Sequence, residues 1–263
     1  MYPNSSYPPV LDSSRLPVGT TVTGEPFGLD YRGNLLLVGE TGSGKSVVLQ
    51  SLIAGAAQQS DLQLVLMDPF RGGSLGRAWK PRASMVADDI ASAASQLNAM
   101  RLLVADRLVG DHLGDEVIVI VEDANIFEQV RHIPDGVPMT RQLLEAQKEN
   151  HASRQALDAM RFIAAWGGHV GVYLYASMQR ADGDHGQAFA AFGRVLLMGR
   201  RAQNVPISTT LRLPAPTLRE CAPGRGVLHV RGQGFDIFDA HYIDSERTVE
   251  IAQRFAGYRT PLV

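Results

Sequence analysis

The sequence predicts an α/β protein in which a mainly parallel central sheet is flanked by helices and ends in a short antiparallel extension. Continuous apolar runs, typical of strands that are buried on both faces, recur along the chain. Helical patterns separate the earlier runs, as the crossovers between parallel strands require. The first long run passes through a glycine-rich turn straight into a helical pattern.

The apolar runs predict the strands, and the patterns between them predict the helices. Strands are expected at residues 34–38, 62–67, 117–121, 170–177, 195–198, 227–230 and 235–241. Helices are expected at residues 45–59, 88–108, 139–166 and 246–255, and Ser245 is the candidate N-cap of the last one. No helical pattern separates the final strands, which favours the antiparallel extension.

Composition and charge exclude several classes of protein. A chain of 263 residues that is 45% hydrophobic can bury a substantial core. Its 25 basic and 27 acidic side chains exclude a globally basic polymer binder, so any contact with nucleic acid must be local. The single cysteine, Cys221, excludes an internal disulfide framework and indicates a reducing compartment, for which we expect the cytoplasm. No apolar run approaches the roughly 18 residues that a membrane span needs, and no signal peptide is recognised.

The beginning of the chain differs from the rest. Residues 1–18 are rich in Pro, Ser and Tyr and show no periodicity, which predicts a flexible N-terminal arm. Residues 19–263 contain no internal repeat and no long linker. They are therefore expected to form a single domain.

The glycine-rich turn matches the eight-residue P-loop pattern GxxxxGK[ST] in the context that the motif requires, between a strand and a helix. Backbone N–H groups of such a loop surround phosphate oxygens, and the start of the helix adds partial positive charge. Lys45 is expected to reach the β- and γ-phosphates of ATP, and Ser46 to hold Mg²⁺. The residues expected to bind the nucleotide are Gly39, Glu40, Thr41, Gly42, Ser43, Gly44, Lys45, Ser46 and Val47.

A second strand delivers two carboxylates, as in a Walker B motif. Residues 117–125 read VIVIVEDAN, so Glu122 and Asp123 follow a buried strand directly. Glu122 is expected to act on the Mg²⁺ and Asp123 to polarise the attacking water. The usual order is Asp and then Glu, and the inversion leaves Asp123 about one carbon short, which makes slow hydrolysis an open alternative. A second alternative is that both charges are simply solvated at a strand end.

Several further segments, in order, resemble the motor domain of the FtsK/SpoIIIE group within the HerA-FtsK class of DNA-pumping ATPases. They are VTGEPFGLD at the approach strand, LQLVLMDPFRG with its DP turn, GVYLYASMQRAD with a sensor-like end, AFGRVLLMGRR, and GRGVL at residues 224–228. Phe70, Met178 and Ala181 depart from the residues that the family usually has there. The resemblance covers about residues 21–239.

The resemblance implies a RecA-like subunit of a hexameric ring, with ATP held between neighbouring copies and double-stranded DNA in the central hole. Gln179 would then read the state of the γ-phosphate. An arginine from the adjacent subunit would stabilise charge on that phosphate, and Arg194, Arg200 and Arg201 are the candidates, with Arg194 preferred. Residues 194–231 contain seven arginines and a single acidic residue, Glu220. This local basic charge favours non-specific contact with DNA phosphates.

Other interpretations remain open. No winged-helix reader and no membrane anchor is recognised, so we expect a stand-alone motor domain, of the kind found on phages, plasmids or integrative elements, or a piece that borrows its guide from another protein. The same fold could instead be an ATP-binding assembly or regulatory subunit with weak hydrolysis. A kinase acting on a small acceptor would need an arginine-bearing lid that we cannot locate. The insertion between Asn125 and His151 could line a pore, pack on a neighbour or decorate the surface.

Overall fold

The computed structural model describes residues 14–69, 74–110, 114–134, 138, 140–179, 192–199, 222–260 and 262. The described strands are β1 (Arg15–Thr21), β2 (Pro26–Asp30), β3 (Leu35–Val38), β4 (Leu62–Met67), β5 (Met85–Ala87), β6 (Glu116–Val121), β7 (Val172–Met178), β8 (Arg194–Met198), β9 (Arg225–Val230) and β10 (Gly234–Ala240). The described helices are α1 (Lys45–Ala57), α2 (Ser74–Trp79), α3 (Ile90–Val109), α4 (Arg141–Trp166) and α8 (Ser245–Arg254), with short 3₁₀ helices η1 (Ala124–Glu128), η2 (Gly167–Val170) and η5 (Ala256–Tyr258).

All described strands belong to one sheet in the order β2-β1-β10-β9-β8-β3-β7-β6-β4-β5. The six strands from β8 to β5 are mutually parallel, and the four strands from β9 to β2 extend the sheet in antiparallel fashion. This confirms the predicted α/β class with a mainly parallel sheet. The antiparallel extension also contains the N-terminal strands, which the sequence did not place there.

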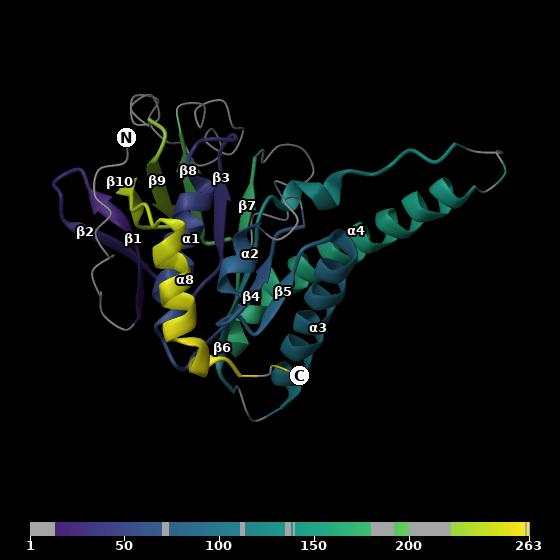
Figure 1. Ribbon diagram of the computed structural model, residues 1–263, viewed down its shortest axis with the longest axis horizontal. Coiled ribbons are helices and arrows are strands. Elements are labelled where there is room, and N and C mark those ends of the chain that lie inside the picture. Colours follow the sequence, from purple (N-terminus) through teal and green to yellow (C-terminus); the bar gives the residue numbers. More distant parts are fainter. Residues whose placement is uncertain are drawn as a thin grey trace.

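Helices cover both faces of the sheet and explain why the strands are apolar throughout. In β6, Val119 and Val121 pack with α3 and α4, whereas Ile118 and Ile120 point to the face covered by α1, α2 and α8. Side chains alternate along a strand, so a strand buried on both faces needs a continuous apolar run. Figure 1 shows α1 and α8 side by side on one side of the sheet and α3 next to α4.

Two sequence expectations need correction at the edges of the fold. β1 begins at Arg15, and Leu16 and Val18 are fully buried, so the predicted flexible arm of residues 1–18 overlaps a strand that pairs with β2 and β10. Residues 1–13 lie outside the described part. At the other end, Asp244 rather than Ser245 caps α8, because its carboxylate accepts a hydrogen bond from the Arg247 N–H at 2.7 Å.

The segment after β6 forms a projection. Residues 129–134 run away from the sheet in an extended conformation, and the N-terminal half of α4 returns along them (Figure 1). Asn150 fixes the base of this projection, because its side chain bonds both the N–H and the carbonyl of Arg131, at 2.8 and 2.9 Å. The predicted insertion is therefore an ordered arm where it is described. Among the described helices, none has the length and apolar character needed to cross a membrane.

Candidate nucleotide-binding site

The candidate site lies where three neighbouring parallel strands end. β3 pairs with β7 and β7 pairs with β6, all in parallel, so their carboxyl ends meet at one edge of the sheet. The P-loop follows β3, the Glu122-Asp123 pair follows β6, and Gln179 follows β7. Segments that are far apart in the sequence thus supply one site.

The glycines of the P-loop are required by its shape. Gly42 and Gly44 have positive φ angles of 80° and 108°, a conformation that side chains disfavour. A Cβ on Gly39 would lie 2.7 Å from the Met198 carbonyl oxygen and equally close to Ser43 Oγ. The motif therefore encodes a tight loop packed against the end of β8.

Lys45 points back into this loop. The residue is 6% exposed, and its ammonium donates hydrogen bonds to the carbonyls of Gly39 at 2.6 Å and Glu40 at 3.2 Å. These two carbonyl oxygens are neutral, and neutral oxygens bind an ammonium more weakly than a phosphate oxygen does. The residues present therefore fit a phosphate group.

Ser46 and Glu122 lie in direct contact. The Ser46 hydroxyl donates a hydrogen bond to Oε1 of Glu122, whose side chain is only 1% exposed. A hydroxyl and a carboxylate are the oxygen ligands that Mg²⁺ prefers. The two residues expected to act on the metal are thus brought together, although they are 76 positions apart in the chain.

Asp123 occupies an unusual turn. It is 3% exposed, and at φ 50° it is the single non-glycine residue with positive φ in the described part of the chain. Its N–H donates a hydrogen bond to Ser177 Oγ at 2.9 Å. This left-handed residue lies between the end of β6 and the start of η1, so the chain turns at the second carboxylate of the pair.

Gln179 lies beside the same turn. Its N–H donates a hydrogen bond to Oδ1 of Asn125 at 2.7 Å. The sequence did not single out Asn125 as part of the site. The available signal was its position two residues after the carboxylate pair, with a side chain that carries both a donor and an acceptor.

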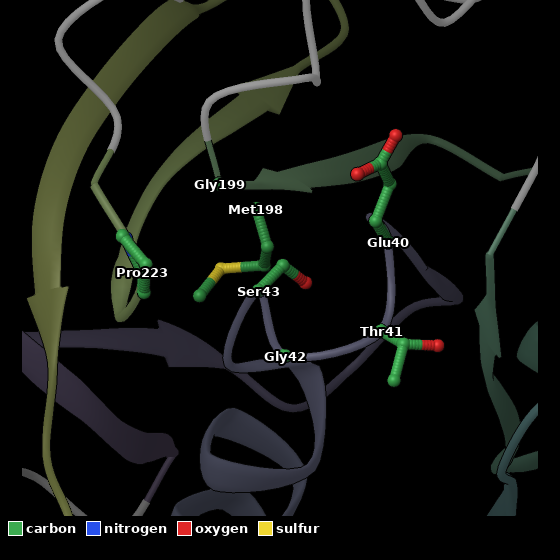
Figure 2. Close-up of a pocket in the computed structure, with 7 residues that line it drawn as sticks. All are labelled: Glu40, Thr41, Gly42, Ser43, Met198, Gly199 and Pro223. Atoms are coloured by element: carbon green, nitrogen blue, oxygen red, sulfur yellow. The ribbon is translucent and has the colours of Figure 1, made fainter.

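The P-loop has a second wall on the β8 and β9 side. The Gly224 N–H donates a hydrogen bond to the Ser43 carbonyl at 3.0 Å. A cavity of about 230 Å³ opens between this wall and the loop. It is lined by Glu40, Thr41, Gly42, Ser43, Met198, Gly199 and Pro223 (Figure 2). In Figure 2 the Ser43 side chain lies next to Met198, whereas the Thr41 side chain points away.

The expectation that Arg194 reaches a neighbouring subunit's phosphate is corrected. Arg194 is 8% exposed, and its guanidinium donates hydrogen bonds to the carbonyls of Asp30, Gly33 and Asn34 of the same chain. It pairs in register with Leu35, at the edge of the sheet opposite the P-loop. Arg194 therefore holds the turn between β2 and β3. The other two candidates, Arg200 and Arg201, lie outside the described residues.

The sequence of this chain is similar to those of known proteins. Residues 10–110 match the model of the FtsK/SpoIIIE family. The chain is 31% identical over 77 residues to protein Tra of Streptomyces lividans, a match that covers 29% of this chain and 12% of that protein. The chain therefore spans only a small part of this curated relative.

Two solved structures share the fold. The pCW3 conjugation coupling protein TcpA, in monomer form with ATPγS, aligns with a TM-score of 0.71 at 18% identity, over 97% of this chain and 73% of that one. The cytoplasmic domain of the Type VII secretion ATPase EccC of Thermomonospora curvata aligns with a TM-score of 0.63 at 18% identity, over 99% of this chain and 32% of that one. These matches confirm the predicted fold, and the family-model match over residues 10–110 supports the resemblance stated from the sequence.

Proposed function

We propose that this chain is a P-loop ATPase domain of the FtsK/SpoIIIE type that hydrolyses ATP and uses the energy to move double-stranded DNA. The observation that carries the ATPase part is the meeting of Lys45, Ser46 and Glu122 at one edge of the sheet. The DNA part is supported by the family and by the fold shared with a conjugation coupling protein.

Binding of the triphosphate would be the task of the P-loop and the start of α1. Backbone N–H groups of the loop and the helix terminus favour negative charge. Lys45 would exchange its bonds to the Gly39 and Glu40 carbonyls for stronger bonds to phosphate oxygens. The cavity beside Met198 and Pro223 offers room for another part of the nucleotide.

Ser46 and Glu122 would hold the Mg²⁺. When bound, this ion neutralises charge on the β- and γ-phosphates. The hydrogen bond between the two side chains keeps both oxygens at the same place before any ion arrives. Glu122 is nearly fully buried, which excludes water and strengthens its interaction with a cation.

Asp123 and Gln179 would act on the attacking water and the γ-phosphate. Asp123 is one methylene shorter than the glutamate usual at this position, and its backbone is fixed by the bond to Ser177. A shortfall of about 1 Å can reduce the rate roughly a hundredfold. We therefore expect slow turnover in the absence of partners.

The assembly and the DNA contact extend the proposal. Copies of the chain would form a hexameric ring in the cytoplasm, with ATP between neighbours and Arg200 or Arg201 reaching the adjacent site. DNA would be held through its phosphates without base recognition, so a separate guide protein would set direction. Arg194 does not take part in this contact because it is buried, and a phosphate that binds Arg225 would compete with the two-bond ion pair of Arg225 with Asp239 at 2.7 Å.

The test is ATP hydrolysis with and without duplex DNA. Wild-type protein should release phosphate faster when duplex is added, whereas Lys45→Ala should show no hydrolysis under either condition. Light scattering with ATPγS should report a ring only when nucleotide is present. A wild-type rate equal to that of Lys45→Ala at every protein concentration would refute the ATPase.

A second candidate function keeps the fold and removes the turnover. The chain would then be an ATP-binding assembly or regulatory subunit, which the short carboxylate and left-handed turn of Asp123 favour. This alternative predicts a ring that forms with ATP and persists without phosphate release. Asp123→Glu separates the two: in a weak ATPase limited by reach, the longer side chain should increase turnover.

A further inference from the structure

One peptide group connects the three segments of the site. The carbonyl of Met178 accepts a hydrogen bond from the Gly39 N–H at 3.1 Å. The N–H of Gln179 donates a hydrogen bond to Asn125 Oδ1 at 2.7 Å. That carbonyl and that N–H belong to the same peptide unit, which is planar and resists twisting. Rotation of this peptide would therefore break contacts on both sides, with the P-loop and with the segment after β6.

Asn125 is suited to hold this peptide because its amide is used from both ends. Its oxygen accepts from Gln179, and its nitrogen donates to Oε2 of Glu128 at 3.0 Å. Glu128 lies on the same turn of η1, so the bond fixes the orientation of the amide. The nearby bond from the Asp123 N–H to Ser177 Oγ joins the same two segments in the opposite direction.

We propose that Asn125 is a positioning residue for ATP hydrolysis, which sets the place of Gln179 through the Met178–Gln179 peptide and links it to the P-loop. The proposal rests on the ATPase function proposed above. Asn125 itself need not touch the nucleotide. It should therefore affect the chemical step and leave nucleotide binding nearly unchanged.

The first experiment compares Asn125→Ala with wild type. We expect kcat to fall at least about tenfold, since a small displacement of a catalytic side chain is costly, while KM and the Kd of ATPγS change less than about twofold. Asn98→Ala is the matched control: it removes the same side chain from α3, where Asn98 accepts a bond from Arg101. Thermal unfolding of both variants reports any loss of folded protein.

The second experiment rebuilds the connection in another way. Asn125→Asp keeps the acceptor for Gln179 but places a carboxylate against Glu128, so kcat should remain low. In the double variant Asn125→Asp with Glu128→Gln, the amide at position 128 donates to the carboxylate at position 125, the reverse of the wild-type bond. The kcat should then return to within about threefold of wild type. A merely structural role for Asn125 would not produce this pattern of rescue.

Amide hydrogen exchange gives a readout that does not depend on activity. The Gln179 amide should exchange faster in Asn125→Ala than in wild type, and as slowly as wild type in the double variant. A kcat unchanged by Asn125→Ala, or equal protection of the Gln179 amide in all variants, would overturn the proposal. If wild type itself lacks ATPase activity, the function proposed above fails. Amide exchange at Gln179, compared between wild type and Asn125→Ala with and without ATPγS, still decides whether Asn125 positions Gln179.

Discussion

The hydroxyl of Ser46 donates a hydrogen bond to the carboxylate of Glu122, and this contact joins the first turn of α1 to the end of β6. Glu122 is the first acid of the inverted pair, so the residue nearest the P-loop is the longer one. A glutamate reaches Ser46 from the end of the strand, which shows that the inverted order still places a carboxylate beside the hydroxyl. The inversion therefore bears on the role of Asp123 rather than on the proposed metal ligands, Ser46 and Glu122.

Glu122→Gln should weaken the use of Mg²⁺. The amide keeps the shape and accepts the Ser46 bond, but it lacks the negative charge that a cation needs. We expect the Mg²⁺ concentration for half-maximal ATPase activity to rise about 10- to 100-fold. Glu145→Gln, an exposed position on α4, is the control and should leave the titration unchanged. Identical Mg²⁺ titrations for Glu122→Gln and wild type would show that Glu122 does not contribute to Mg²⁺ binding.

The wall behind the P-loop gives a second prediction. Gly199 has φ 80°, and a Cβ there would lie 2.8 Å from Ser43 Cβ. Gly232 also has φ 80°, but nothing lies within 4 Å of its Cβ position. Both alanine variants carry the same backbone strain of about 1 kcal/mol. The difference between their ATPγS affinities therefore isolates the effect of the steric clash with the P-loop.

Gly199→Ala should therefore weaken ATPγS binding at least about tenfold, because the P-loop must shift, whereas Gly232→Ala should bind like wild type. Titration calorimetry measures both affinities, and urea unfolding measures the shared loss of stability. Equal affinities for the two variants would show that β8 does not support the P-loop.

The parts predicted correctly depend on local patterns. The P-loop is defined by eight consecutive residues, and the strands by apolar runs that burial on both faces demands. The pairing of β1 with β10 was missed because it joins the two ends of the chain, as in Gly19 opposite Ala240. No local pattern encodes a partner at that separation.

The wrong role expected for Arg194 has a similar cause. The resemblance aligned Arg194 with a motif position but gave no information on where its side chain points. Its place at the first residue of a strand parallel to β3 puts it at the edge away from the P-loop, where the carbonyls of Asp30 and Gly33 need donors. Strand direction was thus the usable signal. Asn125 was missed because its importance comes from a partner 54 positions away.

A cluster at this opposite edge predicts a pH dependence of stability. Glu116 accepts hydrogen bonds from Tyr31, from Tyr173 at 2.7 Å and from Arg32 at 3.0 Å. Burial alone would raise the pKa of Glu116, but the bonds from Arg32, Tyr31 and Tyr173 outweigh it and lower this pKa. A depressed carboxylate pKa stabilises the fold above the unfolded pKa, near 4.5, and this contribution is lost as the pH falls through the lower folded value.

Glu116→Gln should accordingly lower the free energy of unfolding by about 2 kcal/mol at pH 7, because three donors lose a charged acceptor. The difference from wild type should shrink as the pH falls below about 4.5. Urea unfolding between pH 3 and pH 7 measures it, with Glu145→Gln as the exposed control. A difference that stays constant over this range would rule out a linked proton at Glu116.

Arg82 gives the last prediction, since it is a fully buried arginine that binds backbone carbonyls. It donates to the carbonyls of Ala57 at 2.9 Å and Gln59 at 2.8 Å, at and just after the C-terminal end of α1, and to that of Leu62 at 2.6 Å, where β4 begins. Burial lowers its pKa to about 10, and the nearby Tyr258 ring acts in the opposite direction. Because this pKa remains above neutral pH, the guanidinium keeps its charge there.

Arg82→Met should lower the free energy of unfolding by about 3 kcal/mol, because an apolar side chain of similar length leaves three carbonyls without their donor. Arg77→Met, at an exposed position on α2, should change it by less than about 0.5 kcal/mol. Since α1 begins at Lys45, the loss should also speed amide exchange along this helix. If both methionine variants unfold at the same urea concentration, the carbonyl bonds of Arg82 contribute nothing to holding the helix that carries the P-loop lysine.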